Sequence, residues 1–107
     1  MLPLFLYLAK KEVITYARVV SLLCKNPADL LSIPKGSINI GNDADFIVVN
    51  LKNETRIKSF NLHYKCGWSI FDGWKAIFPS SLFIRGERVV GNNEILIKKG
   101  YGKFVGD

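Results

Sequence analysis

The residues of this chain that could carry out chemistry are one histidine, two cysteines and a closely spaced pair of aspartates. A zinc site needs several imidazole, thiolate or carboxylate ligands around the ion, and His63 with Cys66 is too small a set. His63 is therefore interpreted as a partly exposed loop histidine. Cys24 and Cys66 form neither a Cys-x-x-Cys motif nor a disulfide framework, which predicts free thiols in a cytoplasmic protein.

The sequence also shows no pattern typical of a nucleophilic catalytic site or of a phosphate-binding site. A Ser-His-Asp arrangement would depend on His63, the single histidine. The sequence has no glycine-rich loop between a strand and a helix that would hold phosphate. We therefore predict that residues 1–107 contain no catalytic residue, no cofactor-binding residue and no metal ligand.

Asp43 and Asp45 are two residues apart and follow Gly41. Two neighbouring carboxylates could form an acid–base pair. Aspartates beside a glycine more often hydrogen-bond to nearby backbone amides and so stabilise a turn. The second interpretation is favoured, and it predicts that both side chains bond to local amides of a hairpin.

The aromatic residues Trp68, Phe71, Trp74 and Phe78 lie within eleven residues of one another. Such side chains stack on bases or sugars in some binding proteins. They are also the usual anchors of cores and protein interfaces. Because no RNA-binding signature accompanies them, a core or interface role is favoured.

The composition is that of one globular domain, with 49% hydrophobic and 22% charged residues. The formal charge of +6 is spread along the chain. Residues 1–34 hold four basic and two acidic side chains, and residues 35–107 carry the remaining excess of positive charge. A nucleic-acid-binding domain is therefore the less favoured alternative. The apolar run at residues 1–8 lacks a basic segment before it and is too short to cross a bilayer, which favours a buried helix.

Capping and spacing signals predict three helices near the start of the chain. Residues 3–11 form the first, with a proline in its first turn. Thr15 is the expected N-cap of a second helix at 16–24, which has apolar residues at i, i+3, i+4 and i+7. Asn26 is the expected N-cap of a third, short helix, which Pro34 ends.

Strand signals replace helical spacing from residue 35 onward. Strands are expected at 37–40, 45–50, 54–57, 74–78, 81–85, 88–90 and 95–97. The run 46–49 is apolar on both faces, so its strand should be central in the sheet. Gly86 and Glu87 should form the tight turn between the strands at 81–85 and 88–90. Residues 60–73 should be an ordered loop or a short helical turn, and residues 100–105 have no predicted element.

These elements predict an α+β fold. A helical segment at 1–34 precedes a small, mostly antiparallel β domain at 35–107. No internal repeat or low-complexity segment is present.

Several motifs resemble the amidohydrolase superfamily, where an Asn-Pro-Ala helix precedes a Lys-Gly-x-Ile turn and a Gly-x-Asp-Ala-Asp hairpin. Residues 26–28, 35–38 and 41–45 match these motifs in this order. Residues 69–74 are similar to the Ser-Pro-Phe/Tyr-x-Gly segment of dihydroorotases, allantoinases and hydantoinases, although Ile70 stands at the position of the proline. The resemblance extends over essentially the whole chain and implies that residues 1–34 are the last helices of a catalytic barrel.

The resemblance implies a dihydroorotase-like cyclic amidohydrolase, which opens or closes the dihydroorotate ring in pyrimidine biosynthesis. It also implies that the zinc ligands and the catalytic aspartate of the family lie upstream of Met1. This chain is then the C-terminal part of such an enzyme and is inactive alone. The alternatives are a stand-alone interaction module, a pseudoenzyme remnant or, less favoured, the basic nucleic-acid-binding domain.

The expected partner is either a second copy of the chain or a complementary upstream amidohydrolase polypeptide. No membrane partner is expected. In the family the helices pack on a barrel, so here they should leave apolar surface open. The side chains expected to form this surface are Leu4, Phe5, Leu8, Val19, Val20 and Leu23.

Overall fold

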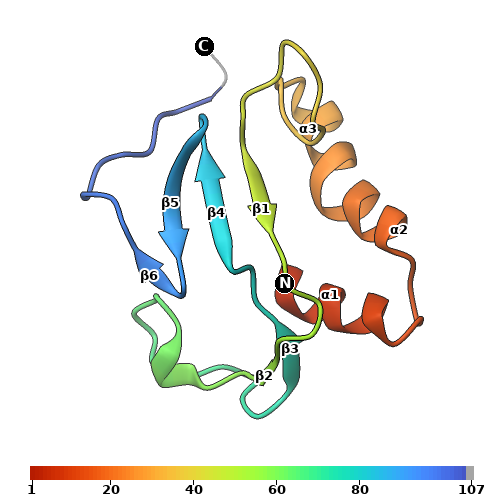
Figure 1. Cartoon of the computed structure of the whole chain (residues 1–107), viewed down its shortest axis with the longest axis vertical. Helices are drawn as coiled ribbons and strands as arrows, with labels where there is room; N and C mark the ends of the chain where they lie inside the picture. Colours follow the sequence, from red (N-terminus) through yellow and green to blue (C-terminus); the bar gives the residue numbers. More distant parts are fainter. Residues whose placement is uncertain (106–107) are drawn as a thin grey trace.

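The computed structural model describes residues 1–105 and confirms the predicted α+β fold (Figure 1). Helical elements come first. They are α1 (Leu2–Lys10), α2 (Tyr16–Val20), a π-helical turn η1 (Ser21–Lys25) and α3 (Asn26–Leu31). The strands follow, with a 3-10 turn η2 (Ser59–Asn61) between the second and third. They are β1 (Phe46–Val48), β2 (Glu54–Arg56), β3 (Lys75–Ile77), β4 (Ser81–Ile84), β5 (Glu87–Gly91) and β6 (Glu94–Ile95).

Helix α1 forms where it was predicted and packs against β3. Pro3 lies in its first turn, where a missing N–H has no helical partner. Leu6 and Ala9 are three residues apart and are both buried. The C-terminal end of the helix is held by an ion pair: Nζ of Lys10 lies 2.8 Å from Oε1 of Glu54 in β2.

The second and third helices are one continuous helical path, which differs from the prediction. Thr15 is the N-cap, since its hydroxyl oxygen accepts a hydrogen bond from the Arg18 amide at 3.1 Å. Asn26 is not a cap, because it and Lys25 both have right-handed helical backbone angles after the π turn. The path ends at Ser32, which has a left-handed conformation with φ of 52°.

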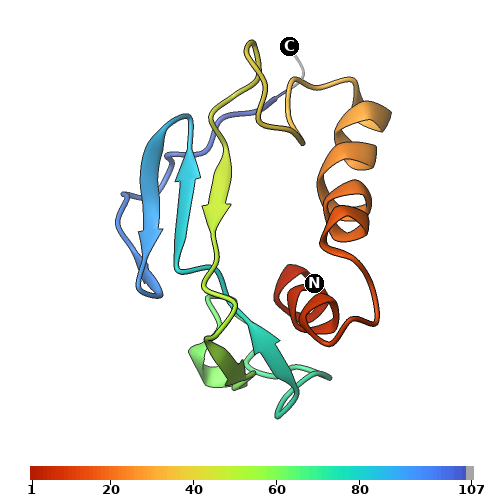
Figure 2. The same cartoon turned by 45° about the vertical axis from the view of Figure 1, so that its right-hand side comes forward.

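Strands β1, β4, β5 and β6 form one antiparallel sheet in that order, and β2 pairs with β3 separately. The expectation that residues 46–49 are central is wrong, since β1 is an edge strand of the described sheet. Phe46 and Val48 are 37% and 47% exposed, so one face of the strand is open. Figure 2 shows the helical elements α2 to α3 standing apart from this sheet.

The strand predicted at 37–40 does not form. Nδ2 of Asn42 donates to the Ser37 carbonyl at 3.1 Å, and Nδ2 of Asn39 donates to the Ser37 hydroxyl at 3.0 Å. Such local side-chain bonds offer the chain an alternative to strand pairing. The turn predicted at 41–43 forms earlier, at 39–42, where the Asn42 amide donates to the Asn39 carbonyl at 3.2 Å.

The β4–β5 hairpin is confirmed, although its turn lies one residue earlier than predicted: Glu87 is the first residue of β5, and the two turn residues are Arg85 and Gly86. Both have positive φ, 51° and 79°, and Ile84 pairs with Glu87 across the turn. Two consecutive positive φ values match the right-handed twist of the flanking strands. The strands expected at 54–57, 74–78 and 95–97 form over fewer residues, and 60–73 is a loop with one 3-10 turn.

The interior is centred on β3 and β5. Ala76 and Ile77 are fully buried, and Val89 is 1% exposed. Adjacent residues of a strand point to opposite faces, so β3 is covered on both sides. None of the helices in residues 1–105 is both long enough and apolar enough to span a membrane.

Candidate functional site

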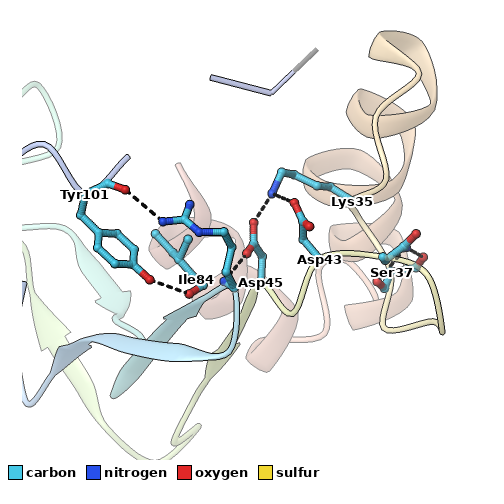
Figure 3. Close-up of polar contacts among 8 residues, drawn as sticks. Lys35, Ser37, Asp43, Asp45, Ile84 and Tyr101 are labelled. Carbon is cyan, nitrogen blue, oxygen red and sulfur yellow. Dashed lines mark hydrogen bonds and ion pairs between the residues drawn. The ribbon is translucent and has the colours of Figure 1, made fainter. Parts of the chain in front are cut away.

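Asp43 and Asp45, the predicted carboxylate pair, meet at Lys35 (Figure 3). Nζ of Lys35 lies 2.7 Å from Oδ2 of Asp43 and also contacts Oδ2 of Asp45. We call these three side chains the Lys35 cluster. The prediction that both aspartates bond to local amides is wrong: the two share a lysine, and the one amide that donates to Asp45 belongs to Arg85, 40 residues away. A lysine in the loop after α3 lies between the carboxylates, because one ammonium has three donors and can serve both.

A second set of contacts extends the Lys35 cluster to the far end of the chain. Oδ1 of Asp45 accepts a hydrogen bond from the Arg85 amide at 2.8 Å. The Arg85 side chain donates to the Tyr101 carbonyl at 3.0 Å and lies 4.5 Å from the centre of the Tyr101 ring. The Tyr101 hydroxyl donates to the Ile84 carbonyl at 3.2 Å. The C-terminal segment, for which no element was predicted, is thereby attached to the β4–β5 turn (Figure 3).

The electrostatics of the Lys35 cluster keep Lys35 and Asp45 charged. The hydrogen bond to Asp43, followed by that to Asp45, raises the pKa of Lys35, although burial acts against this. Burial tends to raise the pKa of Asp45, but hydrogen bonds from Lys35 and the Arg85 amide outweigh it and hold the pKa below its ordinary value. A general acid or base works best with a pKa near the operating pH. The cluster is therefore suited to a structural role.

Replacing Asp45 by asparagine should lower the free energy of unfolding by about 2 kcal/mol at pH 7, because a charge-assisted hydrogen bond to Lys35 is lost. The pKa of Asp45 is lower in the folded chain than its ordinary 3.8. Its stabilisation is therefore present above pH 3.8 and disappears as the pH falls through the lowered pKa. Urea unfolding from pH 7 to pH 2 measures both effects, and the variant should show a shallower acid loss.

Asp29→Asn is the matched control. Asp29 pairs with Lys25 at 2.6 Å, but both side chains are about 60% exposed. Exposed pairs contribute about 0–1 kcal/mol, so this variant should unfold almost as the parent does. Equal losses for the two variants would show that the Lys35 cluster contributes no more than a surface ion pair.

His63 and Cys66 both lie exposed in the loop after η2, as predicted for His63. Nε2 of His63 is 3.3 Å from the Asn93 carbonyl, and Sγ of Cys66 is 3.6 Å from the Trp68 carbonyl. Cys24 and Cys66 are both free thiols. Across residues 1–105 no three metal-ligating side chains come together.

The aromatic residues at 68–78 divide into two groups. Phe78 is half-buried, whereas Trp68 and Trp74 are 65% and 58% exposed. Phe71 and Trp74 make an edge-to-face contact, with ring centres 5.4 Å apart. A core role is therefore wrong for the two tryptophans, and an interface role stays a prediction.

The sequence analysis did not identify Lys35 and Arg85 as partners of the aspartates, or Tyr101 as the partner of Arg85. Their separations from Asp45 are 10, 40 and 56 residues. Spacings of this size carry no periodic signal, since helices repeat every 3.6 residues and strands every two. The one feature of the sequence that could have indicated Lys35 as a partner was its position in the Lys-Gly-x-Ile motif.

Comparison with known proteins gives a consistent result. A sequence model of the amidohydrolase family matches residues 1–89. A dihydroorotase from Archaeoglobus fulgidus is 39% identical over 93 residues, which are 86% of this chain and 23% of that protein. A dihydroorotase from Thermoplasma volcanium is 38% identical over 104 residues, which are 97% of this chain and 25% of that protein. The chain thus spans about a quarter of the length of these curated relatives.

A solved structure shares the arrangement of helices and sheets. L-hydantoinase (dihydropyrimidinase) from Arthrobacter aurescens superposes with a TM-score of 0.93 at 29% sequence identity, and the match covers 99% of this chain and 24% of that one. Nearly every described element therefore has a counterpart in one quarter of that protein. With the family match over residues 1–89, this leads to one conclusion: the chain belongs to the amidohydrolase family.

Proposed function

We propose that this chain is the C-terminal structural quarter of a dihydroorotase-like cyclic amidohydrolase, which hydrolyses or closes a cyclic amide in pyrimidine biosynthesis. The observation that carries the proposal is the chain-long superposition on L-hydantoinase, at a TM-score of 0.93. The names of the two archaeal relatives favour dihydroorotate as the substrate.

The proposed role of the chain is to support a catalytic barrel, with catalysis performed by residues outside it. Asp43 and Asp45 share the ammonium of Lys35 and so are engaged in structure. His63 is exposed and lies against a backbone carbonyl. We therefore assign no catalytic, cofactor-binding or metal-binding role to residues of this chain, and propose that an upstream amidohydrolase polypeptide supplies the zinc ligands.

Exposed apolar side chains on the helices support an association with such a polypeptide. Of the six residues predicted to form this surface, Leu8 and Val20 are 37% and 51% exposed, whereas Val19 is buried. Leu30 and Leu31 on α3 are 85% and 67% exposed and enlarge the surface. Apolar surface of this kind marks interaction sites. A cytoplasmic location is part of the proposal and is supported by the two free cysteines.

A complementation assay tests this proposal. The Archaeoglobus fulgidus dihydroorotase is prepared without the segment that matches this chain, and the chain is then added. We expect the truncated relative to regain dihydroorotate hydrolysis only in the mixture, with full-length relative as the positive control. The chain by itself should bind no stoichiometric zinc and open no ring. Tightly bound zinc with ring opening by the chain alone would contradict the supporting role.

The second candidate is a stand-alone module or pseudoenzyme remnant that associates with itself. The exposed tryptophans Trp68 and Trp74 favour it, because large aromatic side chains are common interface anchors. It predicts that the truncated relative stays inactive in the mixture and that light scattering finds the 12.1 kDa chain as a homo-oligomer. A salt-sensitive DNA complex would instead support the basic nucleic-acid-binding alternative.

A further inference from the structure

A small pocket with no assigned role lies where the β2–β3 sheet meets the turn between β5 and β6. It has a volume of about 230 Å³ and is open to solvent. Thr55 and Arg56 of β2 and Lys58 form one side, and Asn61 of η2 and Asn93 of the β5–β6 turn form the other. In Figure 1 the green segment that carries η2 lies close to this turn.

The charge of this pocket is positive and is not balanced locally. Arg56 and Lys58 line it, and no acidic residue does. Neither cation forms an ion pair with a carboxylate in residues 1–105, whereas Lys10, Lys25 and Lys35 each do. The Arg56 guanidinium donates one hydrogen bond, to the Gly73 carbonyl at 2.7 Å. A guanidinium has five N–H donors, so this bond does not use all of them.

Backbone hydrogen bonds hold the walls of the pocket in place without a ligand. Ile57, between the two cationic residues, is 6% exposed. Its amide donates to the Trp74 carbonyl and its carbonyl accepts from the Gly73 amide, both at 2.8 Å. The Asn61 amide donates to the Lys58 carbonyl at 2.9 Å, which fixes η2 against the end of β2. The backbone around the pocket is therefore fixed, which lowers the cost of binding.

The chemistry of the lining defines the class of ligand. The guanidinium and the ammonium have N–H donors and no acceptor, and each asparagine amide can supply a donor too, so the ligand should be an anionic acceptor. Leu62 and Phe78 add an apolar wall, which favours a ligand with a hydrocarbon part. Drug-sized ligands occupy pockets of about 300–1,000 Å³, so a smaller molecule fits here.

We propose that this pocket binds a small organic carboxylate, with its charge at Arg56 and Lys58 and its apolar part against Leu62 and Phe78. The site uses only groups within this chain. It therefore does not depend on the proposed function, and complementation can fail while the pocket still binds.

Benzoate is the probe, and the side-chain amide resonances of Asn61 and Asn93 report its binding in NMR titrations. We expect benzoate to shift both resonances saturably, and benzyl alcohol, its neutral counterpart, to leave them unchanged. Lys58→Gln should weaken benzoate binding by about fivefold, the effect of losing an ion pair worth about 1 kcal/mol. Arg56 is left intact because it also donates a hydrogen bond to the backbone at Gly73.

Lys52→Gln is the matched control, because Lys52 is an exposed lysine between β1 and β2 that does not line the pocket. It should leave benzoate affinity unchanged, and backbone amide spectra verify that both variants are folded. Equal shifts with benzoate and benzyl alcohol, or equal affinity losses for the two variants, would overturn the proposal. Inorganic phosphate binding as tightly as benzoate would overturn the assignment to an organic carboxylate.

Discussion

Replacing Gly36 by alanine should lower the free energy of unfolding by about 3 kcal/mol. The φ of Gly36 is +83°, a left-handed conformation that costs a residue with a Cβ about 1–2 kcal/mol. A Cβ here would lie 2.5 Å from the carbonyl oxygen of Cys24 and 2.9 Å from the Cβ of Ala28. Overpacking of this kind costs about 1–3 kcal/mol more, because helix backbone cannot move aside as a flexible side chain does.

Urea unfolding with Gly67→Ala as the control separates the two contributions. Gly67 also has a positive φ, +73°, but an added Cβ would meet nothing within 4 Å. Its replacement should therefore cost only the conformational part, about 1–2 kcal/mol. Equal losses at the two positions would mean that the loop at Gly36 does not press against the helical path.

Replacing Ile77 by alanine should destabilise the chain by about 2–5 kcal/mol. Ile77 is completely buried in β3, the strand against which α1 packs. Removing a buried isoleucine side chain loses its transfer free energy and leaves a cavity that the surroundings fill only in part. The effect should appear as a lower urea midpoint with an unchanged slope.

Ile38→Ala is the matched control, since the same atoms are removed from a side chain that is 88% exposed. Surface substitutions of this kind stay within about 0.5 kcal/mol. A loss at Ile77 as small as that at Ile38 would contradict the assignment of the core to β3.

The helices and hairpins were largely predictable from the sequence because their signals are local. Thr15 caps α2 through an amide three residues away, and Pro3 identifies the first turn of α1. The turn at Gly86 follows from its tolerance of positive φ. Each of these signals acts within one turn of chain, so neighbouring residues suffice to specify it. The motifs at 26–28, 35–38 and 41–45 also identified the amidohydrolase family, which the comparison then confirmed.

Strand position in the sheet was not predictable in the same way. The apolar run at 46–49 suggested a central strand, yet β1 lies at the edge of the described sheet and β3 is the strand covered on both faces. Lys75, exposed at the start of β3, makes that strand look like a surface strand in the sequence. The side-chain types of a strand indicate how readily it is buried. Its position in the sheet depends instead on which distant segments of the chain pair with it.

From the sequence alone follow the order of helices and strands, the α+β fold and the resemblance to the amidohydrolase family. Tertiary structure alone decided how Asp45 is used. It brings Lys35 and Arg85, 10 and 40 residues away, to the same carboxylate and so fixes its charge. It also brings Lys58 and Asn93, 35 residues apart, to one pocket. Contacts across such separations depend on packing of the whole chain, because no local backbone geometry specifies them.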